Sequence, residues 1–537
     1  MIRAITILWM LLCVQTTFFG QDLQPEQSFI QQTDRFEKEI KYSEDDFMVI
    51  PLFEDGIALV RDKQKFKSGN KTWELILLND SLKVAHELEL ELEQRKNMIG
   101  FDYVPGQLFM LFRVPDMQRS SLEVVSIELS NAEIKKYEIQ PELTFQLTHF
   151  NVVGSNFLFG GYVTNEPTVL LYNTSGENLK VLPGFFQKQT ELIDLRPNQN
   201  QTFNAILVDR SDRDQRKLIF KTFDLNGVEL LEDVSQIEEK YVLQTGISSG
   251  LVRDDLIITG TWGLRNQRQS LGLYTIPVNP FTEHKVKYIP YGGLSHFLDY
   301  LNPKRAARIK TRTKDAIQVQ KLPDFSSYVV PYRLEENQEG YVLLIEVFNP
   351  SSSSSYNRYP MDYPMGYYPY PMYYSPFWGY YPGMFNRMYN PFAMSNSSTR
   401  SNDEVKMTQS VVVAFDNQGD VLWDYSVNLN DVRMPSLEQV SDFYIENGAL
   451  YVIYKKKDSE LLVKKITLKT GEGEETIEKI KLLNEGDEFR SEDRNYGSVR
   501  YWYGRNFYVW GQHSVRNRTT REEGSRQVFF INKVAIH

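Results

Sequence analysis

The chain has 537 residues, 24% of them charged, and a formal net charge of −10 at pH 7. This length suits two or three ordinary domains, or one large domain built from repeats. The single cysteine, Cys13, lies within the first twenty residues, so the rest of the chain has no thiol for a disulfide, for thiol catalysis or for a thiolate metal site.

Residues 1–20 have the pattern of an export signal. Arg3 supplies the positive charge, residues 4–12 are apolar, and Gly20 is a small residue before the predicted cut. Phe18 suits a signal peptidase poorly, so the exact cleavage site stays open. An exported chain of this size without further cysteine favours a bacterial envelope, either the periplasm or the outer membrane, with the cell surface as an alternative. No later apolar run has the length of a membrane-spanning helix.

Residues 35–537 are predicted to form a single all-β domain. Runs of alternating Val, Ile, Leu and aromatic residues are interrupted by Gly, Asn and Asp, as hairpins require. One turn recurs: an apolar residue, a polar stretch that ends in Gly or Asn, and an apolar residue three positions later. Its clear copies end at Asn131, Gly176, Gly227 and Gly419, and weaker ones at Leu82 and Gly471.

The intervals between these turns are 49, 45 and 51 residues from Leu82 to Gly227, and 52 residues from Gly419 to Gly471. A period of about 40 to 50 residues with about four strands is typical of propeller blades. We therefore predict a β-propeller, with eight blades as the count and seven as the alternative. Two β-sandwiches are the other structural alternative. Residues 35–42 alternate in polarity and could supply the outer strand that closes the ring.

Residues 291–321 depart from the repeat. Asn302 can cap a helix and Pro303 suits its first position, so a short helical insertion is predicted. Its basic residues are Lys304, Arg305, Arg308, Lys310, Arg312 and Lys314. In an acidic chain they predict a docking surface for an acidic partner or an anionic envelope polymer. The alternative is a solvated helix packed by three apolar residues, Phe297, Leu298 and Leu301. The candidate contact residues are Lys304, Arg305 and Arg308.

Residues 350–407 are a second departure, between the predicted strands 341–348 and 409–415 of blade six. Residues 356–392 contain eleven Tyr and seven Pro, and the prolines exclude an ordinary helix or a central strand. Such a density of aromatic residues and Met is typical of interfaces, so this loop is the predicted main contact element. A disordered loop without a partner is the alternative. The candidate contact residues are Tyr367, Tyr368, Tyr370, Tyr373, Tyr374, Phe377, Trp378, Tyr380 and Tyr381.

Residues 415–423, FDNQGDVLW, resemble the repeat of quinoprotein-type and related envelope propellers, in which an aspartate, a glycine and a later tryptophan recur. The resemblance covers one good repeat and several degraded ones, and it implies the fold without a function. A quinone-dependent dehydrogenase of this type would be expected to have a vicinal cysteine pair. This chain has none, so no cofactor is predicted.

The sequence has no motif for catalysis or metal binding. Its six histidines are scattered, and it contains no nucleophile elbow, phosphate-binding loop or dinucleotide fingerprint. Asp209, Asp212 and Asp214 could hold calcium, but Arg210 and Arg213 offset their charge, so a solvated hairpin loop is favoured. No catalytic, cofactor or metal residue is therefore predicted. Carboxylates that converge from different blades would leave no local motif, so glycan hydrolysis stays open.

These features together predict an exported, non-enzymatic propeller that acts as a protein-binding or scaffold subunit of a bacterial envelope complex at the outer membrane. Its partners would be envelope or outer-membrane proteins, and any membrane association would be peripheral. Nucleic acid is disfavoured by the acidic charge. The alternatives are a glycan-active enzyme with carboxylates in the central channel, and an extracellular adhesin or matrix component.

Overall fold

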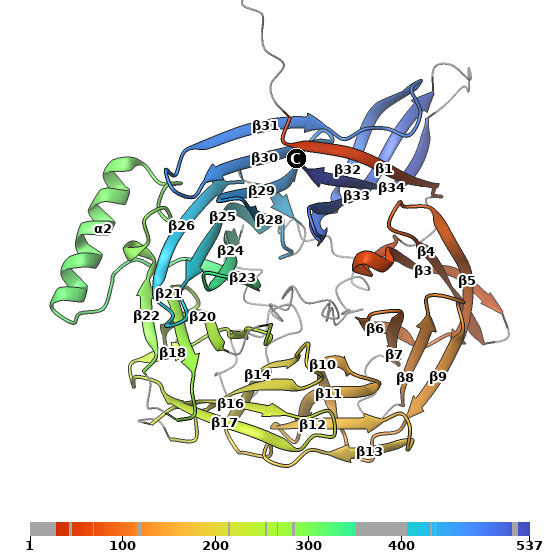
Figure 1. The fold of residues 1–537 in the computed structure, drawn as a ribbon. Coiled ribbons are helices and arrows are strands. Elements are labelled where there is room, and N and C mark those ends of the chain that lie inside the picture. Colours follow the sequence, from red (N-terminus) through yellow and green to blue (C-terminus); the bar gives the residue numbers. More distant parts are fainter. Residues whose placement is uncertain are drawn as a thin grey trace, which may run out of the picture.

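The strands form eight antiparallel sheets that follow one another around a ring (Figure 1). The computed structural model describes residues 28–41, 46–67, 69–114, 121–212, 215–252, 255–265, 267–281, 285–350, 405–429, 432–434, 437–517 and 525–537. In each sheet the first strand of the blade lies nearest the axis and the last lies at the rim (Figure 1). The predicted all-β, eight-bladed propeller is therefore confirmed, and the predictions of seven blades and of two sandwiches are wrong.

The first four blades follow the chain without interruption. Blade one contains β2 (Met48–Pro51), β3 (Ile57–Lys67), β4 (Asn70–Leu78) and β5 (Val84–Glu93), with the 3-10 turn η1 (Phe53–Asp55). Blade two contains β6 (Asn97–Val104), β7 (Gln107–Arg113), β8 (Leu122–Glu128) and β9 (Ile134–Ile139). Blade three contains β10 (Gln146–Val153), β11 (Asn156–Val163), β12 (Glu166–Asn173) and β13 (Asn178–Val181). Blade four contains β14 (Thr190–Pro197), β15 (Phe203–Asp209), β16 (Lys217–Phe223) and β17 (Glu229–Gln236).

The other blades contain the additional elements and the closure. Blade five has β18 (Tyr241–Leu243), β19 (Ile247–Ser248), β20 (Leu256–Leu264), β21 (Ser270–Val278) and β22 (Lys287–Pro290). Next come η2 (Tyr291–Gly293) and α2 (Pro303–Gln318). Blade six has β23 (Tyr328–Glu336), β24 (Tyr341–Pro350), β25 (Val405–Phe415), β26 (Val421–Asn428) and β27 (Arg433–Met434). Blade seven has β28 (Ser441–Glu446), β29 (Ala449–Lys456), β30 (Glu460–Thr467) and β31 (Gly473–Lys479). Blade eight has β32 (Asp487–Tyr503), β33 (Asn506–Asn517), β34 (Arg526–Ile536) and β1 (Ile30–Glu39).

The recurring turn connects the third and fourth strands of blades one, two, three, four, six and seven. In blade six the Asp416 carboxylate accepts hydrogen bonds from the amides of Gln418 and Asp420, each at 2.9 Å. Gly419 then takes φ of +79°, which a residue with a side chain rarely adopts. Blade five has no copy because residues 279–286 form a longer connection there. The repeated sequence pattern thus specifies a turn that reverses the chain between the third and fourth strands of a blade.

Gly419 of the recurring turn and Gly448 of the hairpin between β28 and β29 allow the cost of a left-handed backbone to be measured separately from the cost of a steric clash. Gly419 and Gly448 have similar φ values of +79° and +73°, but a Cβ on Gly419 would lie 2.5 Å from Thr275 Oγ1, whereas one on Gly448 would meet nothing within 4 Å. We expect Gly448→Ala to cost about 1 kcal/mol from the left-handed backbone alone. Gly419→Ala is expected to cost about 1–3 kcal/mol more because it displaces a neighbouring blade. Urea unfolding of both variants measures the difference, and equal losses would contradict this close contact.

The chain closes the ring by pairing its first strand with its last. β1 lies antiparallel to β34, from Ile30 opposite Ile536 to Glu39 opposite Val528. The amide of His537 donates to the carbonyl of Phe29 at 3.0 Å, so the first and last strands meet at their ends. The predicted closing role of the N-terminal segment is confirmed, but the strand spans residues 30–39 and not 35–42. The amide of Ile40 still donates to the carbonyl of Gln527 at 3.0 Å, just beyond the end of the strand.

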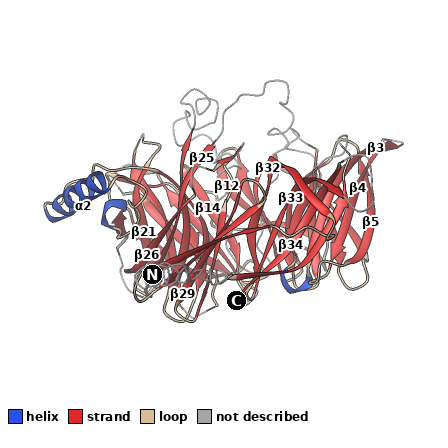
Figure 2. Ribbon diagram, turned by 90° about the horizontal axis from the view of Figure 1, so that it is seen from above, coloured by secondary structure: helices blue, strands red, loops and turns tan. Residues whose placement is uncertain are grey.

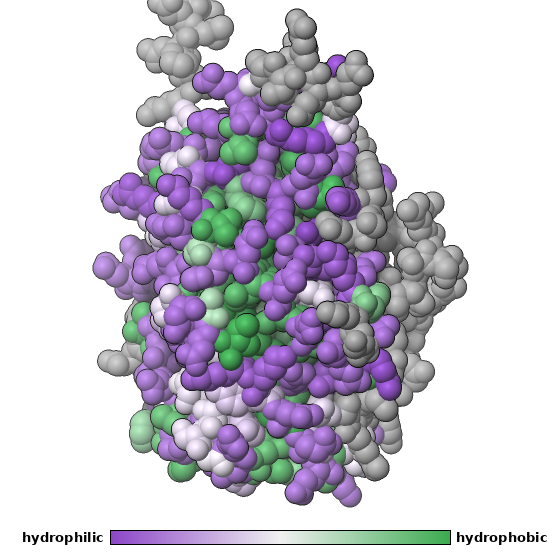
Figure 3. Space-filling view, turned by 90° about the vertical axis from the view of Figure 1, so that its right-hand side faces the viewer, coloured by the Kyte–Doolittle hydropathy of each residue, from purple (hydrophilic) through white to green (hydrophobic). Residues whose placement is uncertain are grey.

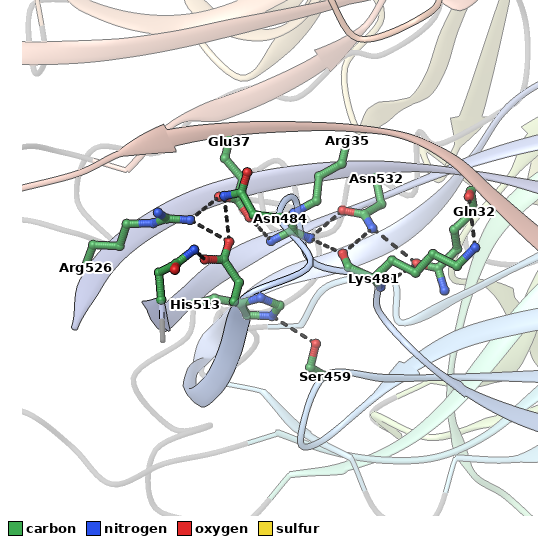
Figure 4. Close-up of polar contacts among 11 residues, drawn as sticks. Gln32, Arg35, Glu37, Ser459, Lys481, Asn484, His513, Arg526 and Asn532 are labelled. Carbon is green, nitrogen blue, oxygen red and sulfur yellow. Dashed lines mark hydrogen bonds and ion pairs between the residues drawn. The ribbon is translucent and has the colours of Figure 1, made fainter. Parts of the chain in front are cut away.

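Buried polar groups fasten β1 to blade eight and to blade seven (Figure 4). Arg35 pairs with Glu37 at 2.6 Å, and Arg526 contacts Glu37 at 3.3 Å and Asp487 at 2.7 Å. The side chain of Gln32 donates to the carbonyl of Lys479, the last residue of β31, at 2.8 Å, and it accepts from the amide of Lys481 at 2.9 Å. Since Lys481 belongs to the connection between blades seven and eight, β1 holds two blades together.

The antiparallel strands divide the connections between two ends of the ring. Links between successive blades, and links between the second and third strands of a blade, share one end. The other links and the C-terminus share the opposite end (Figure 2). The α2 segment links blades five and six, whereas β24 ends at Pro350 and β25 begins at Val405 within blade six. Both additions to the propeller therefore arise at the same end, which we call the α2 end.

Candidate interaction surface

Local sequence signals determine where α2 begins and ends. The side chain of Asn302 accepts a hydrogen bond from the amide of Lys304 at 3.0 Å, and Pro303 occupies the first turn. At the other end Gln320 takes φ of +54° and the amide of Lys321 donates to the carbonyl of Ala316 at 2.8 Å. The predicted short helix is confirmed.

The inner side of α2 packs on the core between blades five and six. Ile309 and Thr313 are buried, and Ala306 is half-buried against the same core. Gly292 allows the contact, because a Cβ there would lie 2.1 Å from Thr313 Oγ1. The predicted apolar support is present, with Phe297 and Leu298 fully buried in this core. The helix is thus firmly seated on the ring.

The segment before α2 is also fastened to blade six by polar contacts. The carboxylate of Asp424 accepts from the amides of Ser295 at 2.7 Å and His296 at 2.6 Å. Gln409 donates its side-chain amide to the carbonyl of Phe297 at 2.6 Å. Burial raises the pKa of Asp424 above its ordinary value. These contacts give α2 a defined position relative to blade six.

The outer side of α2 exposes the predicted contact residues Lys304, Arg305 and Arg308. Arg305, Arg308 and Arg312 are spaced three and four residues apart, which places them on one side of the helix. Arg312 forms an exposed pair with Asp324 at 3.1 Å. Within α2 the one acidic residue is Asp315. The helix therefore presents a basic side to its surroundings.

The aromatic candidates cannot be placed, because Tyr367, Tyr368, Tyr370, Tyr373, Tyr374, Phe377, Trp378, Tyr380 and Tyr381 lie outside the described residues. The strands that bracket them are well defined. Pro350 is opposite Val405, and Asn349 is opposite Lys406. β27 pairs with the other edge of Val405 and Lys406, so the first residues of β25 lie between two strands. The segment 351–404 thus leaves and re-enters one hairpin, as predicted.

Carboxylates on the inner strands hold neighbouring blades together. Asp102 of blade two accepts from the amide of Val152 in blade three at 2.6 Å. Asp442 of blade seven accepts from the amide of Tyr501 in blade eight at 2.9 Å. Burial raises the pKa of Asp102 well above its ordinary value. Backbone amides and, for Asp442, the side chain of Arg333 as well donate to these carboxylates. This role is structural, and it gives no support to a carboxylate pair for glycan hydrolysis.

Sequence reasoning missed these inter-blade contacts. In each case an aspartate precedes an aromatic residue inside a strand, as in Phe101–Asp102–Tyr103 and Ser441–Asp442–Phe443. A charged residue within a buried inner strand is unusual, because an unpaired charge there is costly. That pattern is the signal that could have found them.

Glu346 fastens blade six to blade seven in the same way. Its carboxylate accepts from the amides of Val440 at 3.1 Å and Ser441 at 2.8 Å, and from the Ser441 hydroxyl at 2.9 Å. It is fully buried, and this burial raises its pKa from 4.5 to about 7, against the opposing effect of those hydrogen bonds. The carboxyl group thus titrates near neutral pH.

The pKa of Glu346 predicts a pH-dependent stability. Between pH 4.5 and about 7 the native side chain keeps a proton that the unfolded chain releases. Its stabilisation is therefore complete below pH 4.5 and is lost as the pH rises through about 7. Glu346→Gln keeps an uncharged acceptor and should exceed the wild type in unfolding free energy at pH 8 by roughly 3 kcal/mol. Denaturant titrations at pH 5 and pH 8 compare them, and parallel pH profiles would contradict this assignment.

Of the aspartate cluster, Arg213 and Asp214 lie outside the described residues, as does His284 among the histidines. Within the described part of the chain, no three His, Asp or Glu side chains gather as metal ligands. Burial lowers the pKa of His149 to about 4 and that of His513 to about 2. Asp209 accepts from the amide of Ser211, and Arg210 pairs with Glu191, in the hairpin between β15 and β16. None of the helices among the described residues is long and apolar enough to span a bilayer.

No family model matches the chain, and no curated protein matches it. Among solved structures, it is similar to the WD40 domain of SCAP from fission yeast, with 7% identity, a TM-score of 0.39, and coverage of 94% of this chain and 98% of that one. It is also similar to the β-propeller domain of the Trilobed protease from Pyrococcus furiosus, with 10% identity, a TM-score of 0.31, and coverage of 81% and 94%. A similar prolyl endopeptidase has 9% identity and a TM-score of 0.37 over 91% of this chain, which spans 54% of that protein's length. The fold assignment itself rests on the strand pairing of this chain.

Proposed function

We propose that the protein is an exported, non-enzymatic β-propeller that acts as a protein-binding or scaffold subunit of a bacterial envelope complex associated with the outer membrane. Its partners are envelope or outer-membrane proteins. The segment 351–404 is the main contact element, and the basic side of α2 is the second.

One observation carries this proposal: both additions to the propeller are rooted in or beside blade six, at the same end of the ring. Asp424 and Gln409 hold the base of α2 to this blade, and the hairpin of β24 and β25 carries the segment 351–404. Two contact elements that begin at neighbouring points of one ring suit a scaffold, since both can engage the same partner.

Replacing residues 351–404 by an Asn-Gly turn tests the main contact element. Because Pro350 and Val405 are already paired, the variant should keep the thermal midpoint of the wild type. Affinity purification from native envelope membranes should recover the partner with the wild type and lose it with this variant.

A second variant keeps the length of the segment and changes only its chemistry, with serine at the nine aromatic candidates. It should lose the partner as the deletion does. Recovery of every partner by both variants would disprove the proposed role. Proteolysis of intact cells distinguishes a periplasmic subunit from a surface adhesin, since only the adhesin would be cut.

A further inference from the structure

The C-terminal end of α2 exposes aliphatic side chains next to the basic ones. Ile317, Val319 and Leu322 are 52%, 60% and 40% exposed, and we call these three residues the aliphatic tip. The left-handed Gln320 and the hydrogen bond from Lys321 to Ala316 turn the chain back at the helix end. The tip is therefore a compact corner of the molecule, with Lys314 before it in sequence and Lys321 between Val319 and Leu322.

The helix lies outside the ring, beyond the outer strands of blades five and six (Figure 1). Its basic side and the aliphatic tip are thus presented away from the axis. Cations that contact phosphate groups, together with aliphatic side chains that enter the acyl boundary, are the combination by which peripheral helices bind anionic membranes. An acidic protein would use the cations but would leave the aliphatic tip in water.

Negative charge on the opposite rim would favour an orientation in which α2 faces an anionic surface. β5, on the far side of the ring from α2 in Figure 1, exposes alternate glutamates at its surface, and the rim on that side is largely hydrophilic (Figure 3). These residues are Glu87, Glu89, Glu91 and Glu93. Lys38 and Lys63 offset the first two only in part, since both carboxylates remain exposed. An anionic surface would repel this rim and attract the side that carries α2.

We propose that α2 and the aliphatic tip bind an anionic phospholipid surface. Lys304, Arg305 and Arg308 contact the headgroup phosphates, and Ile317, Val319 and Leu322 enter the interface between headgroups and acyl chains. The proposal rests on the proposed location in the envelope, and it adds the membrane surface to the protein partner.

Flotation of the purified chain with lipid vesicles tests the proposal. We expect binding to vesicles of phosphatidylcholine with phosphatidylglycerol, and weak binding to phosphatidylcholine alone. The triple variant Lys304→Gln, Arg305→Gln, Arg308→Gln should partition on the order of 100-fold less. The variant Ile317→Ser, Val319→Ser, Leu322→Ser should lose about tenfold or more, because buried aliphatic groups contribute in proportion to their size.

A control variant removes the same charge elsewhere. Lys83, Lys135 and Lys469 are exposed residues in or near turns at the opposite end of the ring, and their change to Gln should leave vesicle binding unaltered. All variants should retain the wild-type thermal midpoint, since each changed side chain is exposed. A loss by the control equal to that of the α2 variant would overturn the proposal.

The outcomes separate this proposal from the proposed function. If the chain floats with neither vesicle, while the α2 charge variant loses a co-purified envelope protein, the lipid proposal is wrong and the scaffold role stands. If vesicle binding depends on α2, but partner recovery is unaffected by removal of residues 351–404, the lipid proposal stands and the aromatic contact element is wrong.

Discussion

A chain that starts at Lys41, and so lacks β1, is expected to lose its cooperative unfolding transition. The deletion removes the outer strand of blade eight, with its pairing from Ile30 to Glu39, and the buried side chains of Phe29 and Ile30. Burial of each such side chain contributes about 1.5–3 kcal/mol. Several backbone hydrogen bonds of about 1 kcal/mol each are also lost. The total approaches the entire net stability of an ordinary domain, about 5–15 kcal/mol.

The deletion also removes an ion pair and exposes a strand edge. Without Glu37, Arg526 loses one of its two carboxylate partners, and the edge of β34 is open to pairing with other chains. Guanidinium chloride unfolding followed by circular dichroism and light scattering measures both effects. A chain that starts at Ser28 retains β1 and is the matched control. A synthetic peptide of residues 28–41 should restore part of the transition. If the chain from Lys41 unfolds at the same denaturant concentration as the control, ring closure does not stabilise the propeller.

Asp442→Ala is expected to cause the largest loss of stability among single substitutions, about 3 kcal/mol, because it removes the more deeply buried of the two carboxylates that pair with the buried Arg333; Glu335 is the other. Arg333 of blade six donates to Asp442 at 2.7 Å, and its side chain is 3% exposed. The same carboxylate accepts from the amide of Tyr501 in blade eight at 2.9 Å. The guanidinium lies 4.4 Å from the ring centres of both Phe443 and Tyr501. One side chain thus connects three consecutive blades.

A matched control lies on the same strand. Glu446 of β28 pairs with Arg505 at 2.6 Å, but this pair is at the surface, with the two side chains 26% and 51% exposed. Glu446→Ala should shift the urea midpoint little, because surface pairs are screened by solvent. Asp442→Asn should fall between the two, since it keeps an acceptor but removes the charge. Equal midpoints for Asp442→Ala and Glu446→Ala would show that the buried pair does not join the blades.

Features that depend on short stretches of chain could be predicted well. The turn at Asp416 and Gly419 combines a carboxylate that caps its own backbone with a residue free to take positive φ, so its copies give the blade count. The start of α2 depends on Asn302 and Pro303 alone. The limits of the outer strand of blade eight are harder to predict, because they depend on pairing with β34 at the other terminus of the chain.

Contacts between distant residues could not be predicted. Glu346 accepts from Ser441, which is 95 residues away, and Arg333 donates to Asp442, which is 109 residues away. In the sequence such groups look like the polar, outward-facing residues of alternating strands. Only burial distinguishes them, and burial is a property of the assembled blades.

The sequence by itself determined the turns, the strand alternation, the limits of the helix and the presence of two additions to a repeating fold. These follow from steric and hydrogen-bonding preferences that act within a few residues. The tertiary structure decided that α2 and the two strands around residues 351–404 share one end of the ring, since this depends on the alternating direction of strands within blades. It also decided which basic side chains of α2 stay exposed, because the packing of Ile309 and Thr313 sets the rotation of the helix. The role of the aromatic residues stays a prediction, and its test is the recovery of a partner.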